Sequence, residues 1–248
     1  MPRILIDIPL CDFKKYSQII ALNSIKEFDY ELNKITLFIS CHTEDPNYYT
    51  DLMNWYKDNF KLFEQVIINF WNVSIWSVRK GLRDYNYESL CDSRNQARLH
   101  AIKQDIDYVF SVSSDIIFPK DTLKRLIAVN KPLVGGLVAS ANQDGGQGLP
   151  IAFQLINCCA NVLHGTYQPI IKNADIFTSS CLLISREVFN KVAWRANALP
   201  NDEPGYYPEE AYYVLDTKKL GLGNVNVLMD LCCKHVTHDG KILEVRRI

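Results

Sequence analysis

The chain has 248 residues, a formal net charge of −1 at pH 7 and a hydrophobic fraction of 48%. A near-neutral chain offers no basic field for nucleic acid, and no apolar run reaches the roughly 18–20 residues of a membrane helix. The length and composition suit one ordinary globular domain. The segment from Met1 to Pro9 has a strand's pattern and lacks the order of a signal peptide, so we expect a cytoplasmic protein without an integral membrane segment.

The first half of the chain alternates strands and helices. Apolar runs predict strands over residues 3–8, 35–40, 66–70, 108–112 and 132–138. Helical spacing predicts helices over residues 14–26, 50–60, 88–104 and 119–129, the last beginning at Pro119. This alternation favours an α/β fold, with a mostly parallel central sheet flanked by helices on both faces.

After Ser140 the alternation breaks. Residues 142–148 form a loop with three glycines, which we interpret either as a lid beside the sheet edge or as a plain surface connector. We expect a strand over 175–185, helices over 186–193 and 208–220, and a strand over 225–229. No repeat or linker divides the chain, which indicates a single domain.

Eight cysteines are present, and none belongs to a C-x-x-C pair. Their spacing does not suit a zinc site. Because several lie in apolar runs, we expect buried free thiols. Disulfides are the alternative, as in intracellular proteins of hyperthermophiles.

Asp115 is the first candidate site residue. It follows the buried strand 108–112 through Ser113 and Ser114, where the chain leaves the carboxyl edge of the sheet. Ligands of open α/β sheets bind at that edge. One carboxylate together with a diphosphate could hold Mg²⁺ or Mn²⁺. The alternative is that Asp115 only caps a turn.

Arginines on the preceding helix form the second candidate. Arg94 and Arg98 are spaced i,i+4 and therefore share a face, with Asn95 beside them. The planar guanidinium suits phosphate recognition. A solvated basic face is the alternative interpretation.

Acids and histidines late in the chain complete the candidates. Glu209 and Glu210 lie in the first turn of a predicted helix, where the helix dipole favours the ionised form that a general base needs. His235, with Asp230 and His238 nearby, could complete a metal site begun by a carboxylate elsewhere. For both groups of residues, the alternative is a purely structural role.

In order along the chain, these motifs resemble glycosyltransferases of the GT-A fold, close to the family 2-like group. Members show an Ala-Arg-Asn helix, a strand ending in Asp-x-Asp, a Phe-Pro, a Val-Gly-Gly strand, an apolar strand ending in Arg, a late Glu-Asp pair and a closing histidine. The matching residues here are 93–95, 113–115, 118–119, 134–136, 181–186, 209–210 and 235. Ser113 stands where the family has its first Asp.

The resemblance implies transfer of a sugar from a nucleotide-diphosphate donor to a hydroxyl of a glycan or glycoconjugate. Asp115, aided by His235, would hold Mn²⁺ or Mg²⁺ against the diphosphate, and Ser113 could hydrogen-bond the ribose. Pro9, at the end of the first strand, resembles the family's contact with the nucleotide base. Glu210 would act as base in an inverting reaction.

The same resemblance divides the chain into a nucleotide-sugar half, residues 1–140, and an acceptor half, residues 141–248. One alternative is a catalytically degenerate sugar- or nucleotide-binding protein of this fold. Another is a nucleotidyltransferase, which normally has a Gly-rich loop after the first strand, where this chain has Pro9 to Phe13. The G-x-G-x-x-G of a dinucleotide-binding dehydrogenase is absent there as well.

Overall fold

The main sheet of this computed structural model is mixed, with five parallel and five antiparallel strand pairs among the described residues. The structure describes residues 1–43, 45, 47–71, 76–79, 82–139, 147–148, 152–156, 159–197, 209–245 and 247. Within them, the strands of the main sheet are β1 (Ile4–Cys11), β2 (Ile35–His42), β3 (Gln65–Trp71), β6 (Tyr108–Val112), β7 (Ile116–Ile117), β8 (Leu133–Val138), β9 (Gln147–Gly148), β12 (Ile171–Ala174), β14 (Cys181–Ser185), β15 (Val225–Val236) and β16 (Ile242–Val245). Their order is β3-β2-β1-β6-β14-β8-β15-β16-β9, with β12 and β7 also paired to β15.

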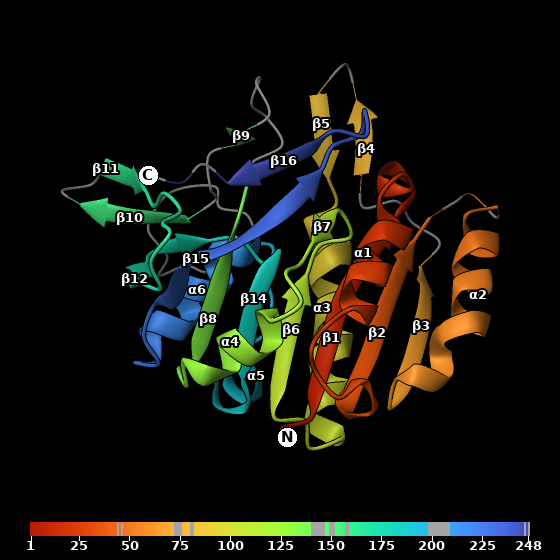
Figure 1. The fold of residues 1–248 in the computed structure, drawn as a ribbon, viewed down its shortest axis with the longest axis horizontal. Helices are drawn as coiled ribbons and strands as arrows, with labels where there is room; N and C mark the ends of the chain where they lie inside the picture. The colour runs from red at the N-terminus through yellow and green to blue at the C-terminus, as the bar shows by residue number, and fades with distance from the viewer. Residues whose placement is uncertain are drawn as a thin grey trace.

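The directions of the strands identify which edge of the sheet is the carboxyl edge, where ligands are expected to bind. Strand β1 is parallel to β2 and β6, β2 is parallel to β3, and β8 is parallel to β15. Only β14, among the strands of this central part, runs antiparallel to both of its neighbours, β6 and β8. The chain begins at the lower end of β1 in Figure 1, so the carboxyl edge of the parallel strands is the upper one.

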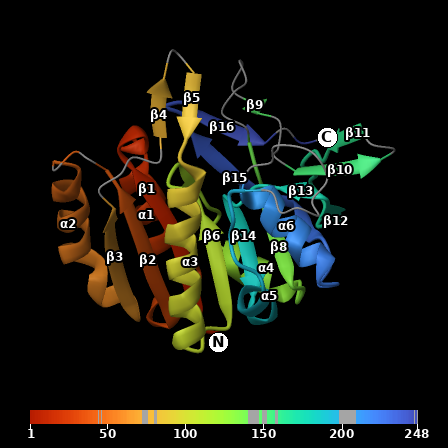
Figure 2. The ribbon, with the colours of Figure 1, turned by 180° about the vertical axis from the view of Figure 1, so that it is seen from behind.

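Helices cover both faces of the sheet. The helices are α1 (Gln18–Lys26), α2 (Tyr48–Asn59), α3 (Tyr87–Lys103), α4 (Thr122–Ala128), α5 (Arg186–Lys191) and α6 (Glu209–Lys219). Buried residues of α1, α2 and α4 pack in one apolar cluster with Ile4, Ile6 and Ile8 of β1. Those of α3, α5 and α6 pack in a second cluster with Leu5. Because successive side chains of β1 point to opposite faces of the sheet, they pack into two separate cores. Figure 2 shows the face that α3, α5 and α6 cover.

The predicted α/β class is confirmed, and β6 has the predicted bounds. The predicted helix start at Pro119 is wrong. Helix α4 begins at Thr122, whose backbone N–H and hydroxyl both donate to the carbonyl of Pro119. The predicted strand 175–185 is two strands, β13 (Ile176–Phe177) and β14, which belong to different sheets.

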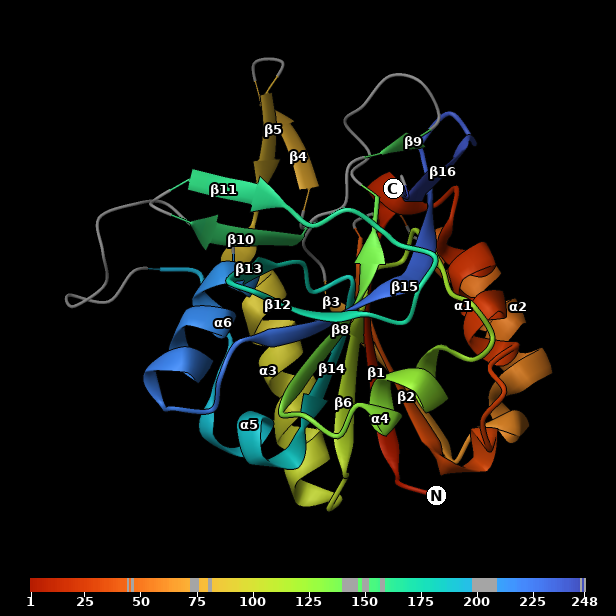
Figure 3. The same ribbon diagram turned by 60° about the vertical axis from the view of Figure 1, so that its left-hand side comes forward.

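Both halves of the chain hold strands that the sequence did not predict. A small sheet joins β10 (Ala152–Ile156), β11 (Cys159–Val162) and β13, and β4 (Trp76–Arg79) pairs with β5 (Leu82–Tyr85). Strands β10 and β11 lie side by side above α6 in Figure 3. Of the predicted glycine loop at 142–148, residues 142–146 lie outside the described residues, and Gln147–Gly148 form the short strand β9. The predicted helix start at Pro208 also lies outside the described residues.

Packing explains the two adjacent glycines of β8. A Cβ at Gly135 would lie 2.2 Å from the ring of Phe177, and one at Gly136 would lie 2.9 Å from Leu231. Phe177 is fully buried. Close packing on both faces of β8 therefore requires a glycine at each of these two positions.

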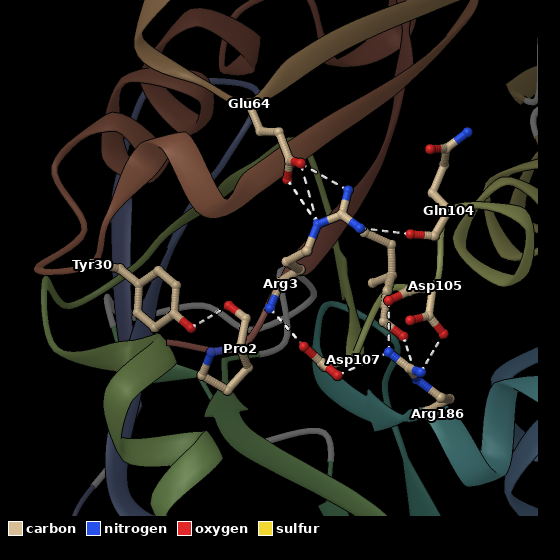
Figure 4. A network of polar contacts seen from close by, with 9 residues as sticks. Pro2, Arg3, Tyr30, Glu64, Gln104, Asp105, Asp107 and Arg186 are labelled. Atoms are coloured by element: carbon tan, nitrogen blue, oxygen red, sulfur yellow. Dashed lines mark hydrogen bonds and ion pairs between the residues drawn. The ribbon is translucent and has the colours of Figure 1, made fainter.

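Polar contacts tie elements together at the amino edge, opposite the candidate site. The guanidinium of Arg3 donates to Glu64 and to the carbonyl of Gln104, and its backbone N–H donates to Asp107. Arg186 contacts Asp107 from the other side. Figure 4 shows this network, which joins the start of β1 to the segments that precede β3 and β6 and to α5.

Five of the described cysteines are buried thiols, as expected: Cys11, Cys41, Cys91, Cys181 and Cys233. Cys232 is half-buried, and it too is a free thiol. Within the described part of the chain, no helix is both long and apolar enough to cross a membrane.

Candidate active site

Asp115 and His235 meet at the carboxyl edge. Residues Ile116 and Ile117 pair with the end of β15, with His235 opposite Ile116. The Nε2 atom of His235 lies 3.0 Å from Oδ2 of Asp115, and the backbone N–H of Val236 donates to the carbonyl of Asp115 at 2.8 Å. The Nδ1 atom of His235 lies 2.7 Å from the carbonyl of Ala139, which fixes the ring. The structure thus brings together the two residues that the sequence placed in a metal site.

Lys14 also reaches Asp115. It belongs to a short 3₁₀ helix, η1 (Asp12–Lys14), directly after β1, and its Nζ lies 2.8 Å from Oδ2 of Asp115. Burial alone would raise the pKa of Asp115, but the Lys14 ammonium and the hydrogen bond with His235 outweigh it and hold this pKa well below its ordinary value. Asp115 is therefore an ionised, buried carboxylate. No sequence pattern indicates that Lys14 is part of this site.

Two buried oxygens at the same turn are unsatisfied. Asp115 is 4% exposed and Ser114 is 1% exposed. Oδ1 of Asp115 and Oγ of Ser114 have no hydrogen-bond partner among the described residues. Leaving such atoms unpaired is costly in a folded protein, so this turn is suited to a ligand.

The donor atoms fit a divalent cation that is shared with a ligand. Oδ1 of Asp115 is an oxygen ligand that Mn²⁺ accepts, and Nε2 of His235 becomes a nitrogen ligand once it has lost its proton and left Oδ2 of Asp115. Among the described residues, no group of three or more His, Cys, Asp or Glu side chains could hold a metal ion. Oxygens of a bound diphosphate and water would therefore have to supply the remaining ligands.

Arg94 lies beneath this edge in a buried polar network. Its Nη1 lies 2.9 Å from Oδ2 of Asp7 and also contacts Ser111, and its Nη2 donates to Oγ of Ser179 at 3.0 Å. Burial raises the pKa of Asp7, although the charge of Arg94 opposes that rise. Arg94 joins α3 to β1, β6 and the turn before β14, so it forms the floor of the site.

Trp194 covers Arg94, and the sequence analysis did not identify it. The guanidinium carbon lies 4.8 Å from the centre of the indole ring. The ring stacks on Tyr213 of α6, with centroids 4.0 Å apart. Asn95 fixes the backbone of Trp194 with two hydrogen bonds, each 2.9 Å long. Asn95, the second residue of the expected Arg-Asn pair, thus positions the Trp194 ring over Arg94. No local sequence pattern indicates this contact.

Arg98 is not brought to the carboxyl edge. It lies one helical turn further along α3, away from that edge, and it donates to the carbonyls of Phe189 and Asn190 at the end of α5. Its side chain therefore caps the carboxyl end of α5, where a basic group can donate hydrogen bonds to the last backbone carbonyls of a helix. We leave Arg98 out of the donor site expected from the sequence.

Ser113 and Pro9 lie on neighbouring strands at the edge. Ser113 shares a hydrogen bond of 2.8 Å with Ser180, whose hydroxyl also contacts Thr178. Pro9 is buried near the end of β1, opposite Ser40 of β2.

The two glutamates of α6 differ in environment. Glu209 is 4% exposed and its Oε2 has no partner among the described residues, whereas Glu210 is half-buried. Burial raises the pKa of Glu209 well above its ordinary value, and the neighbouring Glu210 carboxyl raises it further. Burial thus opposes the ionised form of Glu209, which the helix dipole alone would favour.

The two other late candidates lie apart from Asp115. Asp230 forms an ion pair with Arg125 at 2.6 Å, and His238 is exposed in the turn after β15. Within the described chain, His235 is the histidine that contacts Asp115.

Comparison with solved structures shows the fold. The sequence matches no protein-family profile, and no curated protein is significantly similar to it. The mannosyltransferase PcManGT of Pyrobaculum calidifontis, solved with GDP-Man and Mn²⁺, superposes with a TM-score of 0.60 at 17% identity and covers 97% of this chain. TarS 1–349 of S. aureus, solved with UDP, gives 0.57 at 12% identity over 99% of this chain.

A second structure of TarS 1–349, solved with UDP-GlcNAc, gives a TM-score of 0.54 at 13% identity over 92% of this chain. The alignments cover 59%, 60% and 56% of these three chains, so the present chain spans less than two thirds of their length. At such identities the likeness establishes the architecture: an α/β domain with the fold of GT-A glycosyltransferases.

Proposed function

We propose that this protein is a glycosyltransferase that moves a sugar from a nucleoside-diphosphate sugar to a hydroxyl group of a glycan or glycoconjugate. The observation that carries the proposal is the meeting of Asp115 and His235 at the carboxyl edge, with the unsatisfied Oδ1 of Asp115 buried beside them. The GT-A-type fold and the nucleotide sugars bound by PcManGT and TarS support it.

The donor would lie along the carboxyl edge. Pro9 would contact the base, Ser113 and Ser114 the ribose or phosphates, and Asp115 with His235 would hold Mn²⁺ or Mg²⁺. When bound, such a cation neutralises the charge that develops on the departing diphosphate. Nη1 and Nη2 of Arg94 would not touch the phosphates directly, because they are engaged by Asp7, Ser111 and Ser179. Its Nε is buried and has no partner among the described residues.

Glu210 would be the general base. The bond from the anomeric carbon to the diphosphate breaks, a bond from the acceptor oxygen forms on the opposite face, and Glu210 accepts the proton of the acceptor hydroxyl. The raised pKa of Glu209 favours its protonated form, which would support Glu210 without competing for that proton. This arrangement inverts the configuration of the transferred sugar.

Binding and hydrolysis measurements test the proposal. Calorimetry with UDP- and GDP-sugars in the presence of Mn²⁺ should show binding, and prolonged incubation should release the nucleoside diphosphate. Binding without sugar release, with any acceptor offered, would favour a catalytically degenerate binding protein. Absence of binding for every nucleotide sugar would reject the proposed function.

A further inference from the structure

Lys14 already supplies a positive charge to Asp115 in the candidate site. Its Nζ and the Nε2 of His235 both contact Oδ2 of Asp115, at 2.8 Å and 3.0 Å. The side chain of Asp115 is 5% exposed, and that of Lys14 is 19% exposed. The carboxylate is therefore neutralised from within the protein before any ligand arrives.

A divalent cation that arrives alone meets an unfavourable site. One of the two oxygens of Asp115 already serves two donors, and the cation would lie beside the like charge of Lys14. The neighbouring residue that could have added a second carboxylate is Ser113, whose hydroxyl is bonded to Ser180. Charge and ligand count both oppose binding of the metal by itself.

A diphosphate changes this balance. It brings negative charge and oxygen ligands, and it gives the Lys14 ammonium a second acceptor. Lysine carries a compact charge on a flexible four-carbon stem, so it can turn from a carboxylate to a nearby phosphate. Once Lys14 turns away, Oδ2 of Asp115 is released to the cation.

We propose, on the basis of the proposed function, that Lys14 couples the two ligands: the divalent cation binds well only together with the diphosphate of the donor. In the ligand-free protein Lys14 holds Asp115, and in the loaded protein it contacts the diphosphate. By linkage, each ligand then raises the affinity of the other by the same factor. Lys14 thereby keeps the site from taking up metal before a donor is present.

Titration of Mn²⁺, followed by the electron paramagnetic resonance signal of the free ion, tests the coupling in the absence and presence of UDP and GDP. In the parent protein we expect weak binding of Mn²⁺ alone and tighter binding with a nucleotide. Lys14→Met should strengthen binding of Mn²⁺ alone by about tenfold, or about 1.4 kcal/mol. The same variant should weaken binding of metal-free nucleotide and reduce the enhancement.

Two further variants control the experiment. Lys15→Met removes the adjacent lysine, which is 43% exposed and 4.0 Å from Asp45, and it should behave like the parent. Lys14→Arg keeps the cation and should also keep weak binding of Mn²⁺ alone, even if Lys14→Met were poorly folded.

The outcomes separate the two proposals. If the parent binds nucleotide with metal but Lys14→Met binds Mn²⁺ alone no better than the parent, the coupling is wrong and the proposed function stands. The same holds if Lys14→Arg binds Mn²⁺ alone more tightly than the parent. If no nucleoside diphosphate binds to any variant, both the proposed function and the coupling fail.

Discussion

Arg94 and Asp7 form an ion pair of 2.9 Å in which each side chain is only 2% exposed. Replacing Arg94 with Met should cost about 3–5 kcal/mol of unfolding free energy, because the Asp7 carboxylate is left buried without its counter-charge. Denaturant unfolding measures the loss. Asp7→Asn in the same chain should restore part of it, since the remaining group is neutral.

An exposed ion pair provides the matched control for Arg94. Lys124 pairs with Asp29 at 2.7 Å, and the two side chains are 44% and 67% exposed. Lys124→Met should cost about 1 kcal/mol or less. Equal losses for Lys124→Met and Arg94→Met would show that the buried pair has no special role.

Asp115→Asn should remove metal-dependent binding of the donor while the fold remains intact. The amide keeps the shape of the carboxylate but loses the charge that a divalent cation and Lys14 require. Calorimetry with a nucleotide sugar and Mn²⁺ measures binding, and far-ultraviolet circular dichroism checks the fold. Donor binding equal to that of the parent would show that Asp115 is not the metal ligand.

The pair of His235 with Asp115 should make stability depend on pH. Burial alone would lower the pKa of His235, but the hydrogen bond and charge of Asp115 outweigh it and raise this pKa above 6.5. The folded state thus favours the protonated ring. The stabilisation is fully present below the unfolded-state pKa and is lost as pH rises through the folded-state pKa.

The difference in unfolding free energy between the parent and His235→Gln, followed from acidic to alkaline pH, measures that effect. It should be largest on the acidic side and should shrink as the imidazole loses its proton. A difference that grew towards alkaline pH would mean that the neutral ring is the form the fold prefers.

Glu210→Gln and Glu209→Gln should have unequal effects on transfer. Loss of a general base typically lowers turnover by about 10²–10⁴-fold, so Glu210→Gln should bind the donor yet transfer little. The raised pKa of Glu209 favours its protonated form, and glutamine resembles that form. Glu209→Gln should therefore retain most activity. The reverse ranking of turnover numbers would assign the base to Glu209.

Gly135→Ala should destabilise the protein by about 1–3 kcal/mol through overpacking, because the new methyl group would lie 2.2 Å from the Phe177 ring. Thermal unfolding measures the change. Phe177→Leu relieves the overlap, so the double variant should lose less than the sum of the two single changes. Additive losses would mean that the glycine is needed for another reason.

The sequence predicts those parts of the fold that local patterns encode. Strands β1, β2, β6 and β8 are continuous apolar runs because helices cover both of their faces, and such runs are visible without a structure. Strand β15 was predicted only as far as residue 229. Its second half alternates with polar residues and pairs with β7 and β16, partners that the sequence does not reveal.

The candidate site was predictable only in part, for a related reason. Asp115 is predictable because it follows an apolar strand that ends at the carboxyl edge, and His235 because it follows the apolar run 225–229. The roles of Lys14 and Trp194 are not predictable, because they depend on contacts with distant residues. Arg98 shares a helix face with Arg94, yet its position one turn further along α3 gives it carbonyl partners instead.

The link between Asp115 and His235 closes a loop of 120 residues, and it is reinforced by the backbone bond from Val236 to Asp115. Contacts of such sequence separation are entropically expensive and form slowly. A chain still emerging from the ribosome has Asp115, Ser114 and Lys14 long before β15 is made. The candidate ligand-binding turn is therefore complete only after the 120-residue stretch between Asp115 and His235 has been made and β15 has joined the sheet.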